Sequence, residues 1–214
     1  MAALRSIMPG SAAVILLVAV STAGGCDTVH RAEWTEDVRL ADGSTIVLAR
    51  DQEYDGPRQI FQAPVPSSYG FEFRMPGSGE RVSWTSGIDL VPIAILMGHG
   101  RPILLTTPLP HGMMRHQCPD PPYLAFEFVD GKWTALPLPD LPVRVVSPNM
   151  TGILATYDFA ATGGHRPHLT VAEVRTRLPE DLSGRFVDLS GVEKQVFGTR
   201  CLPPYDMLLR DVAD

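Results

Sequence analysis

The sequence predicts a mainly β fold, in which antiparallel hairpins form a sandwich or a partly open barrel, with one short helix at about 170–178. Three observations lead to this fold class. Apolar and polar residues alternate with a period of two in several stretches, as in strands that are buried on one face. Asp-Gly pairs, which are typical of tight hairpin turns, separate such stretches at 42–43 and 130–131. Twenty prolines are spread along the chain and discourage long helices.

The first 25 residues have the order of a secretory signal peptide. Arg5 precedes an apolar run at 12–20, and small residues follow at 21–25. The apolar run is about half of the roughly 20 residues that a membrane-spanning helix needs. We therefore expect residues 1–25 to be removed rather than to remain as a membrane span.

The end of this segment, Ala23-Gly24-Gly25-Cys26, resembles the lipobox of bacterial lipoproteins. In that family the signal peptide is cleaved before the cysteine, whose thiol carries a diacylglycerol and whose new amino group is acylated, commonly with palmitate. The resemblance implies lipidation of Cys26 and attachment to the bacterial cell membrane through these acyl chains, facing the periplasm. It leaves the inner or outer membrane open. The alternative is ordinary cleavage after Ala23, since Ser21 and Ala23 have the small-x-small spacing of general signal peptidase sites.

The cysteine count favours a disulfide between Cys118 and Cys201. Thiols of exported proteins normally pair in an oxidising compartment, and lipidation would take Cys26 out of the count. The alternative is that Cys118 and Cys201 both stay reduced in a core.

The predicted organisation is a signal peptide (1–25), a lipidated cysteine with a short tether (26–33) and a single mainly β domain (34–214). The formal net charge is −6, without a run of basic residues. Nucleic acid is therefore a poor candidate partner. We expect the membrane to be bound by acyl chains, and an envelope protein to be a further partner.

The first predicted hairpin follows Trp34, which shares one face of an extended segment with Val38 and Leu40. Asp42-Gly43 precedes the β-rich stretch 45–48 and predicts a type I′ turn.

A second hairpin is predicted by the alternation of aromatic residues after 67. Tyr69, Phe71 and Phe73 alternate with small or charged residues, the loop falls at 76–79, and Val82 resumes the pattern with the second strand.

Two apolar runs meet at Gly98-His99-Gly100, where we interpret His99 first as a turn residue. Pro92 and Pro102 lie within these runs and predict edge positions or bulges, because proline cannot donate to a sheet ladder.

A further hairpin places Leu124, Phe126 and Phe128 on one face, turns at Asp130-Gly131 and returns through Trp133. The single predicted helix follows much later. Thr170 and Glu173 form a capping box there, and Val171, Val174 and Leu178 have the spacing of a core-facing side.

The segment HGMMRHQC, residues 111–118, is the stretch best suited to a metal. His111, Met113, Met114 and His116 combine imidazole and thioether ligands, which suit copper in an oxidising compartment. The alternative, which we favour, is a surface loop anchored by the disulfide and without a cofactor.

Other candidate chemistry is weaker. His165 and His168 are spaced for zinc on a helix, but Pro167 between them favours a loop. We interpret Glu36 and Asp37 as acids on a solvated strand face. The sequence contains neither a Gly-x-Ser-x-Gly nucleophile elbow nor a Cys-x-x-Cys motif, so no catalytic residues are assigned.

The early Trp-x-Glu strand at 34–36 with its Asp-Gly hairpin, and the stretch YLAFEFVDGKW after a cysteine, are similar to small uncharacterised lipoproteins of proteobacteria. The functional hypothesis is a membrane-anchored envelope lipoprotein that acts as a binding or structural module. The alternative is a periplasmic hydrolase or a copper-handling protein.

Overall fold

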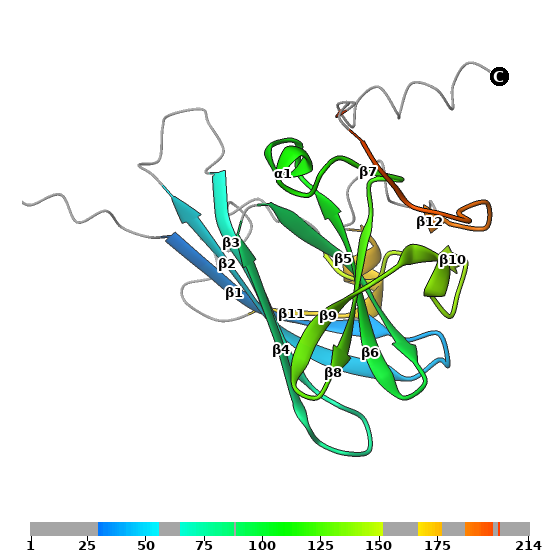
Figure 1. Cartoon of the computed structure of the whole chain (residues 1–214). Helices are drawn as coiled ribbons and strands as arrows, with labels where there is room; N and C mark the ends of the chain where they lie inside the picture. Colours follow the sequence, from blue (N-terminus) through cyan, green and yellow to red (C-terminus); the bar gives the residue numbers. More distant parts are fainter. Residues whose placement is uncertain are drawn as a thin grey trace, which may run out of the picture.

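The computed structural model describes residues 30–55, 65–87, 89–151, 167–176, 187–198 and 201. Two mainly antiparallel sheets form the two main layers (Figure 1). The first sheet has the order β11-β1-β2-β3-β4 and the second the order β5-β6-β8-β9. The predicted mainly β class is confirmed, and the arrangement is that of a sandwich.

The long strands follow one another along the chain as hairpins. Those of the first sheet are β1 (His30–Arg39), β2 (Thr45–Asp55), β3 (Val65–Arg74) and β4 (Arg81–Gly87), and those of the second are β5 (Leu90–Gly98), β6 (Arg101–Pro108), β8 (Leu124–Val129) and β9 (Lys132–Leu136). The short strands are β7 (Pro119–Asp120), β10 (Val145–Val146), β11 (His168–Leu169), β12 (Val187–Asp188) and β13 (Val196–Phe197). Among the described strands, all pairings are antiparallel except that of β1 with β11, which is parallel. β1 begins inside the segment 26–33 that we predicted as a tether.

The turn between β1 and β2 differs from the prediction. Gly43 has a positive φ of 85°, but Asp42 does not, so the type I′ prediction is wrong. The amide of Gly43 donates to the Leu40 carbonyl (3.0 Å), as in a three-residue loop. Asp42 accepts hydrogen bonds from both the hydroxyl and the amide of Ser44, which lowers the pKa of Asp42 and holds the loop in this form.

The other hairpin turns agree with the sequence. Asp130 and Gly131 both have positive φ, 50° and 77°, as a type I′ turn requires. His99 and Gly100 have the same pair of φ values, which confirms His99 as a turn residue.

The two strand prolines have different positions. Pro92 lies at a bulge in β5, an edge strand, as predicted. Pro102 lies in β6, which is an inner strand, so the prediction of an edge or bulge is wrong there. It is tolerated because β6 pairs with β8 only from Ile103 to Thr106, so Pro102 lies outside that ladder.

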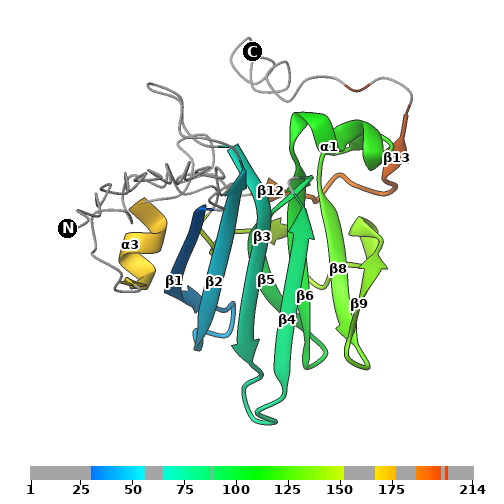
Figure 2. The same cartoon turned by 90° about the vertical axis from the view of Figure 1, so that its left-hand side faces the viewer.

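The main core fills the space between the two sheets. Figure 2 shows the sheets from the side of the first one. Phe71 stacks on Trp84 with ring centroids 5.6 Å apart, and Trp133 of the second sheet forms a T-shaped pair with Phe71, with centroids 6.1 Å apart. The indole Nε1 of Trp133 also donates to the carbonyl of Ser83, at 2.7 Å. A second apolar cluster, which includes Leu105, covers the other face of the second sheet beneath residues 138–146 and 187–192.

Two short α-helices and one 3-10 turn (Leu138–Asp140) accompany the described strands. α3 (Val171–Thr176) confirms the predicted helix; the amide of Thr170 donates to Glu173 Oε2 at 2.8 Å, as in a capping box. Leu178 lies outside the described residues. α1 (Pro110–Arg115) was predicted as a loop, and that prediction is wrong. Proline suits the first position of this helix, where no amide partner is needed.

Candidate functional site

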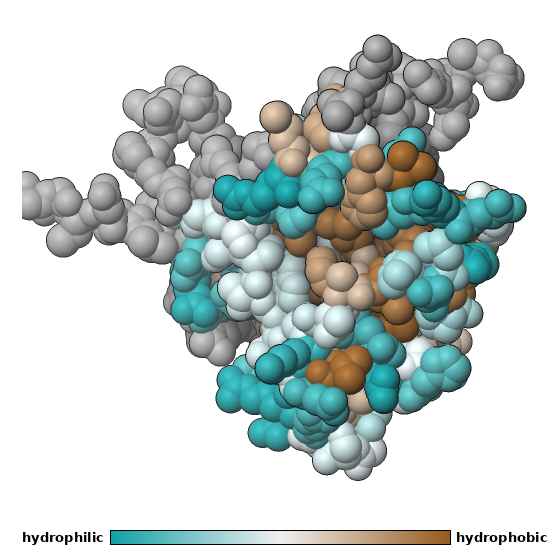
Figure 3. All heavy atoms as spheres, in the orientation of Figure 1, coloured by the Kyte–Doolittle hydropathy of each residue, from teal (hydrophilic) through white to brown (hydrophobic). Residues whose placement is uncertain are grey.

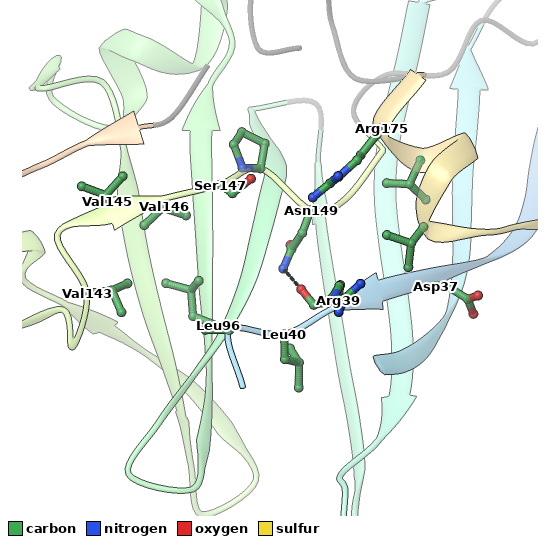
Figure 4. Close-up of a pocket in the computed structure, with 14 residues that line it drawn as sticks. Asp37, Arg39, Leu40, Leu96, Val143, Val145, Val146, Ser147, Asn149 and Arg175 are labelled. Carbon is green, nitrogen blue, oxygen red and sulfur yellow. Dashed lines mark hydrogen bonds between the residues drawn. The ribbon is translucent and has the colours of Figure 1, made fainter. Parts of the chain in front are cut away.

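A cavity of about 280 Å³ lies between β1, α3 and the segment 143–149 (Figure 4). Its wall is mostly apolar and includes Leu40, Leu96, Val143, Val146 and Val174. These side chains come from both sheets and from α3, so the cavity exists only because the sandwich has closed. Its volume is near the lower end of the range for small-molecule sites.

Two arginines, Arg39 and Arg175, line this cavity. Neither side chain makes a hydrogen bond or an ion pair with the described residues, although every other arginine in the described ranges has an acceptor. In Figure 4 the side chain of Arg175 extends from α3 toward Asn149, while the carboxylate of Asp37 points outward. The two guanidinium groups therefore bring unpaired positive charge to an apolar cavity.

Asn149 forms the floor of the cavity and joins the two sheets. Its Nδ2 donates to the carbonyls of Arg39 in β1 (3.1 Å) and Ile95 in β5 (2.8 Å), and its Oδ1 accepts from the amide of Ile95 (2.9 Å). One side-chain amide thus satisfies three backbone groups and holds β1 against β5.

A chain of polar side chains borders the cavity on β1 and β11. Nε2 of His168 lies 3.3 Å from Oδ1 of Asp37, and its Nδ1 lies 2.9 Å from the hydroxyl of Thr35. His168 is half exposed, with 48% of its side chain accessible. The three groups hold the short strand β11 beside β1, and they also align a hydroxyl, an imidazole and a carboxylate.

The opposite face of β1 carries a buried ion pair between the sheets. Nη1 of Arg50 donates to Oε1 of Glu36 at 2.7 Å, and both side chains are 0% exposed. Oε2 of Glu36 accepts from Trp34 Nε1 (2.9 Å) and from the hydroxyl of Thr151. The prediction that Glu36 lies on a solvated face is wrong, because it is on the same side of β1 as the buried Trp34 and Val38.

Several buried polar atoms of β2 and β3 have no hydrogen-bond partner within the described ranges. They are Arg50 Nε, both amide atoms of Gln52 and the hydroxyl of Tyr69. Gln52 and Tyr69 are cross-strand neighbours in β2 and β3. Burial raises the pKa of Tyr54 to about 12 and raises that of Tyr69 further, because the charged phenolate would be poorly solvated there.

The candidate copper residues do not converge on one point. Met113 is 5% exposed and belongs to the interior, whereas its neighbour Met114 is 78% exposed. Nε2 of His116 is buried and has no hydrogen-bond partner among the described residues, and burial lowers the pKa of His116. The side chain of His111 lies outside the described residues. Within the described ranges, no three His, Cys, Asp or Glu side chains are placed to share a metal.

Cys118 and Cys201 form a disulfide, with Cα atoms 5.0 Å apart across 83 residues, as predicted. The bridge ties the end of α1 to the C-terminal part of the chain. Cys26 and His165 lie outside the described residues. In the part of the chain that the structure describes, no helix is long and apolar enough to cross a bilayer.

A second hollow, of about 340 Å³, lies beside β8 and β9 and is lined by Leu124, Phe126, Leu136 and Phe197. Figure 3 shows a band of hydrophobic residues through the middle of the face seen in Figure 1, with hydrophilic residues on both sides. Phe197 is 52% exposed beside this hollow. The hollow presents apolar surface, but no arginine of the described ranges lines it.

Sequence reasoning missed Arg39, Arg175 and Asn149. The tripeptide Asn149-Met150-Thr151 has the pattern of a glycosylation site, but all of its side chains serve the interior: Asn149 joins the sheets, Met150 is in the core and Thr151 binds Glu36. Comparison with protein-family models, curated proteins and solved structures found no match.

Proposed function

We propose that this chain is a bacterial envelope lipoprotein, anchored by acyl chains on Cys26 and facing the periplasm, whose β sandwich binds a small ligand. The observation that carries the binding role is the cavity beside β1, which gathers the two arginines that lack partners in the described ranges. The signal-like segment and Ala23-Gly24-Gly25-Cys26 support the anchoring. An envelope protein partner remains a prediction.

The walls of the cavity are held in place before any ligand arrives. Asn149 joins β1 to β5 by three hydrogen bonds, and the capping box of Thr170 and Glu173 fixes the start of α3. Preorganised walls reduce the entropy that binding must overcome. This rigidity favours a binding module over a surface that orders only on contact.

Anchoring is tested by metabolic labelling with a palmitate analogue, together with the intact mass of the mature chain. We expect Cys26→Ser to lose the label and to leave the membrane fraction. Ala23→Leu is the matched variant: it should keep the label, since leucine suits a lipobox, but it should block a general signal peptidase that cleaves after residue 23. A wild-type chain that begins at Gly24 with an unmodified Cys26 would contradict the anchoring.

A hydrolase is the second candidate, because Thr35, His168 and Asp37 align a hydroxyl, an imidazole and a carboxylate. The purified chain would be assayed against ester substrates of increasing size. Activity that Thr35→Ala and His168→Asn abolish, and that Thr85→Ala on an exposed strand position retains, would favour hydrolysis. Equal turnover by all the variants would count against it.

A further inference from the structure

The cavity beside β1 has two chemically different parts. Its wall is made of aliphatic side chains, among them Leu40, Leu96, Val143 and Val174. Its polar side carries Arg39 and Arg175, which come from β1 and α3. A ligand that fills the cavity must therefore match both an apolar wall and positive charge.

The described residues do not neutralise this positive charge. The carboxylate that also lines the cavity, Asp37, is 3.3 Å from His168 and points outward in Figure 4. In a chain with a net charge of −6, the exposed arginines Arg31, Arg81, Arg101 and Arg115 all have carboxylate partners. Arg74 and Arg144 donate instead to backbone carbonyls. Arg39 and Arg175 have no acceptor within the described ranges, and both line the same cavity. Guanidinium groups recognise carboxylate and phosphate oxygens through charge-assisted hydrogen bonds.

We infer that the cavity between β1, α3 and residues 143–149 binds an amphiphilic anion, whose carboxylate or phosphate lies against Arg39 and Arg175 and whose short apolar part lies against the aliphatic wall. This assignment rests on the proposed binding function and names the class of its ligand. A volume of about 280 Å³ admits a short chain rather than a complete long-chain lipid.

The apolar contribution can be separated from the anionic one by the choice of probes. The Cys26→Ser chain, studied without detergent, would be titrated with acetate, butyrate, hexanoate and octanoate, and then with octyl phosphate and inorganic phosphate. Affinity should rise about fourfold for each methylene that enters the cavity, and then level off. Octyl phosphate should bind more tightly than inorganic phosphate. Equal affinities for acetate and octanoate would overturn the apolar half of the inference.

The role of the arginines is tested by matched double variants. Arg39→Gln with Arg175→Gln should weaken octanoate binding at least tenfold, and the corresponding lysine pair should recover part of it. Arg81→Gln with Arg101→Gln removes the same charge elsewhere and should change the affinity less than twofold. An equal loss in both glutamine pairs would overturn the assignment of these arginines. Thermal unfolding of each variant verifies that it is folded.

Uncharged and cationic probes test separately whether the cavity binds a ligand at all and whether that ligand is an anion. Octanol and octylamine should bind at least tenfold more weakly than octanoate. If either binds as tightly, the cavity is a ligand site but its ligand is not an anion, and the inference fails while the binding function stands. If none of the probes binds, both fail.

Discussion

Arg50 and Arg39 belong to the same hairpin but lie in opposite environments. Arg50 is 3% exposed between the sheets, where Glu36 and the carbonyl of Thr151 accept its hydrogen bonds and the Trp34 ring lies 5.2 Å away. Arg39 is exposed at a cavity and makes no such contact within the described ranges. A buried charge must be paired for the fold to exist, whereas an exposed one can stay unpaired and remain available to a ligand.

The most severe test of this contrast removes one member of the buried pair. Arg50→Met should lower the free energy of unfolding by about 3–5 kcal/mol, because it leaves the carboxylate of Glu36 buried without its cation. Arg39→Met should change it by less than about 0.5 kcal/mol, as is usual for surface sites. Urea denaturation measures both. Equal losses in the two variants would contradict the idea that the fold depends on Arg50 but not on Arg39.

Arg50→Met combined with Glu36→Leu provides the matching control. With both charges replaced by apolar groups of similar size, much of the lost stability should return, since pairs of this kind are often no better than apolar packing. A double variant as unstable as Arg50→Met alone would show that the cost comes from packing rather than charge.

The next largest effect concerns Asn149, which lies between the two environments. Asn149→Ala removes three hydrogen bonds to backbone groups, and we expect a loss of about 2–3 kcal/mol in the free energy of unfolding. It should also weaken octanoate binding, because the cavity loses its floor. Ser147→Ala, at another position in the lining, should do neither.

High pH should lower the free energy of unfolding through the buried region, where Tyr54 lies, and not through the cavity. The unfolded state releases the proton of Tyr54 near pH 10, whereas the folded state keeps it until about pH 12. Over this interval the folded state binds more protons, so its stability falls as the pH rises. Denaturation at several pH values should show a shallower fall for Tyr54→Phe than for the wild type. The same slope in both would contradict the assignment.

The smallest predicted effect is a gain. The hydroxyl of Tyr69 is buried and has no hydrogen-bond partner in the described part of the chain, so Tyr69→Phe should stabilise the fold by about 1 kcal/mol. Thermal unfolding would show it as a higher midpoint. A lower midpoint would mean that the hydroxyl has a partner in solution, such as a buried water.

The sequence predicted the hairpins well because alternation and turn residues are local signals. The same alternation also predicts the side of the strand on which Glu36 lies. Glu36 stands midway between Trp34 and Val38, so the period that buries those two also buries Glu36. Its charge alone led to the wrong assignment. The signal for a buried carboxylate was therefore its position in the strand.

The cavity could not have been predicted in this way. Arg39 and Arg175 are far apart in the chain, and they come together only because β11 pairs with β1 and α3 follows β11. α1 was missed for a different reason: it has six residues, including Pro110 and Gly112, and the amide of Gly112 donates to Leu109 in its first turn. Segments this short depend on tertiary contacts more than on helix propensity.

The first strand also imposes an order on folding. Glu36 contacts Thr151 across 115 residues, and Thr35 contacts His168 across 133. β1, the first strand in the described part of the chain, is thus completed only when later parts of the chain arrive. Contacts between such distant residues slow folding, because the entropy of closing long loops is lost before the contacts form. A chain with this topology should fold more slowly than one built from local hairpins alone.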